Sequence, residues 1–441
     1  MKIVIALACL MPFTLSGQDF DSEKLVNYLN LLEEKNRAMG SIAISEAGEE
    51  VFSHSFGYSR VETGEKAESQ TIYRVGSVSK TFTAALVLIL KEEGKLQLGD
   101  PISNYFDGLP NGDKITIRHL LMHRSGLFNF TNSDDYTDWM EEEQTREELL
   151  NLFRDQEPEF EPAERTEYSN TNFVLLSFLI EDLTDMTFSE ALKKKITEPL
   201  GLKNTFITDD ITNAENHAQS YNFKGEWKPS TETHPSVPLG AGALSSTTAD
   251  LNRLLEGLFG GKIISEESLK EMTSPVNGFG MGIFQLPFYD LIMWGHTGGI
   301  DGYMSVFAWH EDKQLAVSAN FNGLSMSMND ILIATLSIYL GRDFEIPEIT
   351  EPLVMLEEEL LPYTGLYTSE TFPLDVTITT EGNTLMGQAT GQPPFPLEPK
   401  GDHVFTLDQV GLRLSFETEE NKMVLEQGGM NFVMYRSADE E

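Results

Sequence analysis

The spacing of apolar residues in the first 342 positions predicts strands at both ends of this region and helices between them. Leu25, Leu29 and Leu32 lie on one face of a helix expected over residues 21–37. Strand-like stretches occupy residues 41–45, 51–58, 304–309 and 315–320. An apolar helix is expected over residues 327–340. Because strands from both ends can pair in one sheet, we expect an α/β (α+β) domain in which helices flank a largely antiparallel sheet.

The middle of this region is predicted to be helical, with one long interruption. A long apolar helix begins near Ser77 and ends at Gly94, and shorter ones are expected over residues 116–122 and 172–183. Residues 128–167 are acidic, rich in aromatic residues and weakly periodic. They fit either a surface excursion that walls a binding site or an ordinary helical insertion.

Short strands and turns dominate the end of the chain. The prolines and acids of residues 343–360 indicate a linker. Beyond it, strands are predicted at residues 375–380, 384–389, 403–407, 412–417, 423–427 and 432–436. So many short strands within residues 361–441 indicate a small antiparallel barrel or sandwich, and we expect the β-barrel. It either binds a lipid or peptide or braces the domain before it, and bracing is favoured.

The first residues have the pattern of a signal peptide. Lys2 precedes a mostly apolar run that ends in small residues, so we expect residues 1–17 to be removed and the protein to be exported, periplasmic or secreted. A buried N-terminal helix fits less well because Pro12 interrupts the run. Lipoprotein anchoring at Cys9 is disfavoured because the apolar run before it is very short. No later run reaches the roughly 20 apolar residues of a membrane span.

Composition excludes several kinds of chemistry. Cys9 is the only cysteine, so the mature chain is expected to have no disulfide, thiolate nucleophile or cysteine–metal site. The chain has 31 basic and 70 acidic residues, which argues against nucleic acid as a partner because phosphate binding needs basic patches. No cofactor is expected, and oligomeric state is left unassigned.

The chemistry is predicted to centre on Ser77 and Lys80. A serine hydroxyl needs a base within hydrogen-bond reach, and residues three apart lie on one side of a helix. Burial and the positive end of a helix dipole both disfavour a charged lysine, which leaves Lys80 able to act as that base. The helix start also leaves the Ser77 N–H free to bind an oxyanion. Taken alone, S-x-x-K is a weak signal.

Two further elements supply complementary groups. In Tyr168-Ser169-Asn170, a tyrosine can relay protons and an asparagine can bind a substrate amide, although helix capping is the alternative. The string from Trp294 to Gly299 fits a strand edge stripped of side chains for a substrate backbone. A glycine-rich turn is the alternative there.

These three elements, in this order, resemble the motifs of the serine β-lactamase and penicillin-binding-protein superfamily. The chain is similar to its class C β-lactamase-like group, which includes D-alanyl-D-alanine carboxypeptidases, D-aminopeptidases and esterases. The S-x-x-K, Y-x-N and H-T-G motifs match, and so do the strings at residues 115–127 and 240–246. The resemblance covers about residues 20–342 and implies a β-lactamase/transpeptidase-like domain over residues 18–342. The string at residues 361–367 resembles the start of a lipocalin-like domain that some of these hydrolases carry.

The resemblance implies a role for each motif residue. Ser77 is the acylated nucleophile, Lys80 and Tyr168 transfer protons, and the oxyanion lies between the N–H groups of Ser77 and Gly299. Substrate-binding residues are expected to be Asn170, His296, Thr297 and Gly298. Class C β-lactamases usually have lysine where this chain has His296, and histidine is more typical of peptidases and esterases.

The sequence therefore predicts an exported serine hydrolase for a small amide, a peptide (with D-residue peptides favoured) or an ester. A β-lactamase or carboxylesterase of the same fold is the alternative, and a catalytically idle binding protein is the alternative from another class. His119 and His123 have the spacing of a zinc pair but no third ligand, so capping and packing roles are expected for them.

Overall fold

The computed structural model describes residues 20–207, 216–351, 353–369, 371–372, 374–390, 394–407, 411–427 and 429–437. The expected signal peptide and Cys9 lie outside these residues. Among the helices that are described, none has the length and hydropathy needed to cross a bilayer.

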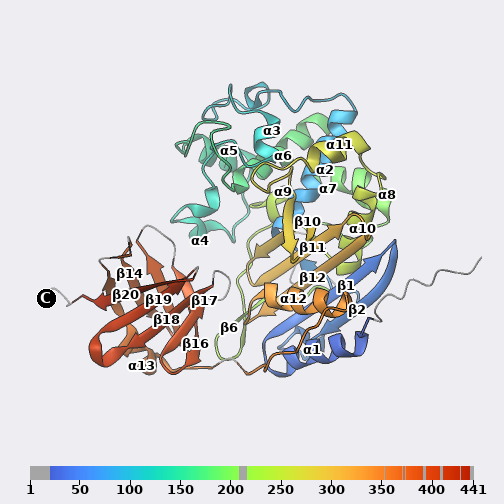
Figure 1. Ribbon diagram of the computed structural model, residues 1–441. Coiled ribbons are helices and arrows are strands. Elements are labelled where there is room, and N and C mark those ends of the chain that lie inside the picture. Colours follow the sequence, from blue (N-terminus) through green and yellow to red (C-terminus); the bar gives the residue numbers. More distant parts are fainter. Residues whose placement is uncertain are drawn as a thin grey trace, which may run out of the picture.

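The hydrolase domain is built on one sheet to which both ends of the domain contribute strands (Figure 1). The strand order is β2-β1-β12-β11-β10-β9, all antiparallel, and β12 also pairs with β6, which pairs with β7. The bounds are β1 Ala38–Glu46, β2 Glu49–Phe56, β6 Tyr221–Phe223, β7 Trp227–Pro229, β9 Phe284–Phe288, β10 Leu291–Ile300, β11 Tyr303–His310 and β12 Leu315–Leu324. The predicted antiparallel sheet flanked by helices is confirmed.

Two short ribbons accompany this sheet. They are β3 (Tyr58–Arg60) with β4 (Glu65–Lys66), and β5 (Tyr73–Arg74) with β8 (Ser245–Ser246). The second ribbon leads directly into the predicted nucleophile segment.

Helices cover both faces of the sheet. On one face α1 (Ser22–Glu34) and α12 (Met328–Tyr339) bury their apolar sides against β1 and β12, as the leucine spacing predicted. The other face carries α10 (Thr248–Phe259) and, beyond it, the rest of the helical region. That region contains α2 Ser79–Glu92, α3 Ile117–Leu121, α6 Asn170–Thr184, α7 Phe188–Leu192, α8 Glu198–Leu200, α9 Leu239–Gly242 and α11 Glu266–Met272.

Helix α2 is apolar on almost every side and is correspondingly buried along most of its length. It follows a 3₁₀ turn, Gly76–Val78, which carries Ser77. Helix α6 packs beside it and is buried from Thr171 to Ile180. The two helices that follow the first and second motifs therefore form the centre of the core.

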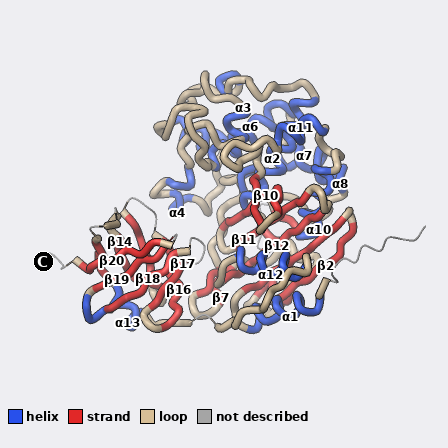
Figure 2. The backbone as a smooth tube through the Cα atoms, in the orientation of Figure 1, coloured by secondary structure: helices blue, strands red, loops and turns tan. Residues whose placement is uncertain are grey.

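The excursion over residues 128–167 combines loop with short helices, as Figure 2 shows around α4. It contains a 3₁₀ turn at Phe130–Asn132, α4 (Tyr136–Trp139) and α5 (Arg146–Arg154). Thr145 and Glu148 form a capping box that starts α5, and the apolar side of α5 is buried. The excursion is thus anchored to the core and is not a free surface loop.

The C-terminal region folds as a closed antiparallel barrel of strands β13 to β20. Their bounds are Gly365–Thr368, Val376–Glu381, Thr384–Ala389, Phe395–Gly401, Val404–Leu407, Leu412–Glu417, Lys422–Gln427 and Met430–Arg436. Tyr363, Tyr367, Phe405 and Phe416 pack together inside it. The predicted small barrel is confirmed, although β13 and β16 were missing from the prediction.

Few polar contacts join the barrel to the hydrolase domain. Arg37, at the entry to β1, donates to Glu398 on β16 at 2.7 Å, with both side chains largely buried. Lys224 and Glu381 form a more exposed pair at 3.5 Å. Helix α13 (Glu357–Leu360) precedes the barrel, and Leu360 is part of the barrel core.

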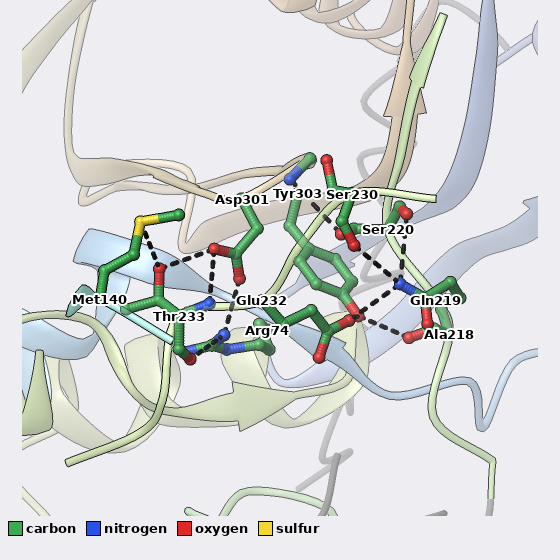
Figure 3. Close-up of polar contacts among 11 residues, drawn as sticks. Arg74, Met140, Ala218, Gln219, Ser220, Ser230, Glu232, Thr233, Asp301 and Tyr303 are labelled. Atoms are coloured by element: carbon green, nitrogen blue, oxygen red, sulfur yellow. Dashed lines mark hydrogen bonds and ion pairs between the residues drawn. The ribbon is translucent and has the colours of Figure 1, made fainter. Parts of the chain in front are cut away.

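A buried ion pair holds the segment before Ser77 (Figure 3). The Arg74 guanidinium donates to Asp301 Oδ2 at 2.7 Å and to the Thr233 carbonyl at 2.8 Å. Thr233 returns two bonds to Asp301 Oδ1, from its N–H at 2.9 Å and its hydroxyl at 2.7 Å. The side chains of Arg74 and Asp301 are 0% and 1% exposed. The pair therefore fastens β5 to the turn after β10 and to the loop around Thr233.

We expect Asp301→Asn to lower the free energy of unfolding of the hydrolase domain by about 3–5 kcal/mol, because it leaves the Arg74 charge buried without compensation. Urea denaturation followed by tryptophan fluorescence measures this change, since all four tryptophans lie in this domain. The matched control is Asp182→Asn, which breaks a half-exposed pair with Arg146 and should cost less than about 1 kcal/mol. Equal losses in the two variants would contradict the expectation.

Candidate active site

Ser77 lies where the ribbon, the 3₁₀ turn and β10 meet. Gly76 has φ +50°, and a side chain there would come within 2.9 Å of the Gly299 backbone. Ser77 itself is partly exposed at the start of the core helix α2. The backbone geometry that presents the serine therefore requires glycine before it.

Lys80 is fully buried one turn after Ser77. Its Nζ lies 3.0 Å from Ser77 Oγ, 2.7 Å from Asn170 Oδ1 and 2.6 Å from the carbonyl oxygen of Ala241. Burial lowers the pKa of the Lys80 amine well below the usual 10.5. A neutral amine has two N–H donors and one lone pair. The two carbonyl oxygens take the donors, so the lone pair is left for the Ser77 hydroxyl proton.

Tyr168 also reaches Ser77 and lies next to Lys80. Its phenol oxygen lies 2.7 Å from Ser77 Oγ, and its ring centroid lies 4.8 Å from Lys80 Nζ. Burial raises the pKa of the Tyr168 phenol, and the hydrogen bond to Ser77 offsets part of this rise. The phenol is therefore protonated at neutral pH.

Asn170 begins α6 and has a partner for each half of its amide. Its oxygen accepts from Lys80, and its Nδ2 donates to Thr131 Oγ1 at 3.1 Å. The Asn170 N–H is bound in turn by Asn129 Oδ1 at 2.8 Å. This amide orients Lys80, and the substrate-binding role predicted for it stays a prediction.

The third motif forms the part of β10 next to Ser77. Thr297 and Gly299 are exposed, whereas Gly298 is buried against the nucleophile segment. A Cβ on Gly298 would lie 2.0 Å from the Val75 carbonyl oxygen and 3.1 Å from the Ser77 backbone nitrogen. Gly298 is thus required by the close approach of the nucleophile segment to β10, whereas the approach of a substrate backbone to this edge stays a prediction.

His296 faces the interior. Its ring is 1% exposed, its Nδ1–H donates to the Thr297 carbonyl at 2.5 Å, and it packs on Phe284 at 4.2 Å between ring centroids. Burial lowers its pKa to about 3, and the nearby Lys80 acts in the same direction. This position of the motif therefore carries a neutral side chain and offers no cation to a substrate.

The sequence prediction missed two polar groups that touch the site, the Ala241 carbonyl and the Thr131 hydroxyl. The sequence analysis matches the string at residues 240–246 to the family but assigns it no role in the site. His119 and His123 have the capping and packing contacts expected for them: His119 forms a capping box with Thr116 on α3, and His123 stacks on Tyr168.

Known proteins share both the sequence pattern and the fold. The profile of the Beta-lactamase family matches residues 28–337. A penicillin-binding protein of Bacillus subtilis (strain 168) is 27% identical over 448 residues, covering 93% of this chain and 95% of that protein.

Two solved structures are also similar. The octameric penicillin-binding protein homologue from Pyrococcus abyssi has 25% identity and a TM-score of 0.65, and the match covers 94% of this chain and 100% of that one. The D-amino acid amidase from Ochrobactrum anthropi SV3, complexed with L-phenylalanine amide, has 25% identity and a TM-score of 0.65, covering 72% of this chain and 98% of that one. The chain belongs to the Beta-lactamase family, whose members are serine hydrolases.

Proposed function

We propose that the protein is an exported hydrolase that cleaves a small amide or peptide, with D-residue peptides favoured, or an ester, through an acyl-enzyme on Ser77. One observation carries this proposal: Ser77 Oγ lies between the Lys80 amine at 3.0 Å and the Tyr168 phenol at 2.7 Å. Export is inferred from the sequence of residues 1–17.

In the first step Ser77 Oγ attacks the substrate carbonyl and its proton passes to neutral Lys80. Asn170 and Ala241 hold the two amine hydrogens, so the lone pair is aimed at the hydroxyl. The Ser77 and Gly299 N–H groups are the proposed oxyanion donors, and the absence of a side chain on Gly298 lets the two segments approach.

Tyr168 protonates the leaving group. Its raised pKa keeps the proton on the phenol until the departing nitrogen or oxygen takes it, and Lys80 then replaces that proton. In the second step water attacks the ester and gives up a proton to Lys80. As the acyl group leaves, Lys80 passes that proton to Ser77 Oγ, so Lys80 and Tyr168 are both back in their starting protonation states.

The neutral His296 side chain in the third motif supports amides and esters as substrates. A substrate carboxylate, as in a β-lactam, gains little from the His296 side chain, because it is neutral and turned inward. The similarity to a D-amino acid amidase supports the choice of amides and of D-residues.

Labelling tests the nucleophile. We expect a fluorophosphonate to add one adduct, located at Ser77 by mass spectrometry, and we expect Ser77→Ala to abolish it. Thr81→Ser, which removes a buried methyl group and keeps the hydroxyl that donates to the Gly282 carbonyl, is the control and should label normally. An adduct that persists in Ser77→Ala would refute the mechanism.

A substrate panel tests the class. Short D-residue amides and peptides, p-nitrophenyl esters and a chromogenic cephalosporin are compared by kcat/KM, and we expect the cephalosporin to be the poorest. A cephalosporin turned over faster than every amide and ester would identify a β-lactamase instead.

The pH dependence tests Lys80. Because its pKa is lowered, kcat/KM should hold through neutral pH and fall only as acid protonates the amine, well below pH 10.5. Lys80→Arg keeps a cation without a usable lone pair and should lose about 10²–10⁴-fold in kcat. A wild-type rate that rises up to pH 10 would indicate a charged lysine and contradict the assignment.

A further inference from the structure

The segment after α3 forms a cradle for the second motif. Phe128 accepts from the Thr171 hydroxyl at 2.6 Å, Ser125 donates to Asn172 at 2.6 Å, and Asn129 accepts from the Asn170 N–H. Residues 123–131 therefore run along residues 167–172 and bind them repeatedly. Tyr168 projects from the start of this bound stretch.

His123 is the member of the cradle that contacts Tyr168 and both its neighbours. Its carbonyl accepts from the Glu167 N–H at 2.9 Å, and its Nδ1 accepts from the Ser169 N–H at 3.1 Å. Its ring stacks on the Tyr168 ring, with centroids 4.3 Å apart and planes 26° apart. One residue thus holds the peptide before the tyrosine, the peptide after it, and the ring itself.

The conformation of His123 is unusual for a packing residue. It is fully buried and has φ +53°, in the left-handed region that few non-glycine residues adopt. Such backbone persists only where the surroundings determine it, and it is concentrated at functional sites.

The charge state of His123 follows from its bonds. Since Nδ1 accepts the Ser169 N–H, the ring proton is on Nε2, for which the described part of the chain supplies no hydrogen-bond partner. Burial holds the pKa of His123 well below its usual 6.5, and Lys80, His296 and Tyr168 are the titratable groups around the ring. Phe173 and Phe279 complete the surroundings. A neutral ring leaves the phenol proton undisturbed.

We propose that His123 is a positioning residue that fixes the Tyr168 ring so that its hydroxyl stays within hydrogen-bond reach of Ser77 Oγ and of the leaving group. The inference rests on the proposed function, because it assigns to Tyr168 the protonation of the leaving group. A phenol without this stack and these two flanking bonds is free to rotate away from Ser77.

The test uses His123→Asn. Asparagine tolerates the left-handed backbone and can accept the Ser169 N–H, but it has no ring to stack on Tyr168. Two esters with the same acyl group are compared, one with an alkoxide leaving group and one with p-nitrophenolate, which departs without a proton. We expect kcat/KM per labelled Ser77, which reports the acylation step, to fall at least 10-fold on the alkyl ester and less than 3-fold on the p-nitrophenyl ester.

Two comparisons separate positioning from folding. Normalising to fluorophosphonate-labelled Ser77 removes any loss of folded protein. In the Tyr168→Phe background, His123→Asn should cause no further loss on the alkyl ester, since its effect passes through the missing phenol. His119→Asn changes a nearby imidazole, on α3, whose side chain bonds to the Thr116 N–H in the capping box, and it should leave the ratio of the two rates unchanged.

If His123→Asn is not recovered folded, His123→Gly, which adopts φ +53° without strain, replaces it with the same expectation. Equal losses on both esters, with Ser77 labelled normally, would overturn the role of His123 alone. Failure of Ser77 to label in the unchanged protein would instead refute the proposed function.

Discussion

A lysine amine enclosed in the core is the constraint on which the hydrolase domain depends. Burial disfavours the charged form of Lys80, but a buried amine without partners is itself costly. The structure buries the amine and still gives it two hydrogen-bond acceptors, one carbonyl oxygen from α9 and one amide oxygen from α6. The base therefore exists only while α2, α6 and α9 are packed together, so the stability of this core and the reactivity of Ser77 are parts of the same arrangement.

The groups around Lys80 are in turn held by residues farther from it. Asn170 is held by Thr131 and Asn129, and Tyr168 by His123, all from the segment that begins at the end of α3. On the other side, Ser305 donates to the Val75 carbonyl at 2.7 Å and Arg74 binds Asp301. The side chains proposed to act in the reaction are thus each bound by residues from another part of the fold.

The sequence identified what depends on side-chain type and local spacing. Ser77, Lys80 and Tyr168 were found because a helical turn or a short motif places their groups. The role of the Ala241 carbonyl could not be predicted, because every residue carries a backbone carbonyl. The inward orientation of His296 could not be predicted either, because it depends on packing against Phe284. In the barrel, β16 was not predicted because it contains Pro396 and Pro399, and proline is rare in paired strands. In the structure, the pairing of β16 with β17 shifts register between Pro399 and Gly401.

The sheet order has a consequence for how the chain is made. Strand β1 lies between β2 and β12, so the edge of the first hairpin has no partner until residues 315–324 have been synthesised. Contacts between such distant segments form late because the intervening chain must first be brought together. Gly298 and Gly299 also come from this late part, so a chain still emerging from the ribosome carries Ser77 and Lys80 without a finished active site. The hydrolytic activity is thereby withheld until most of the domain has been translated.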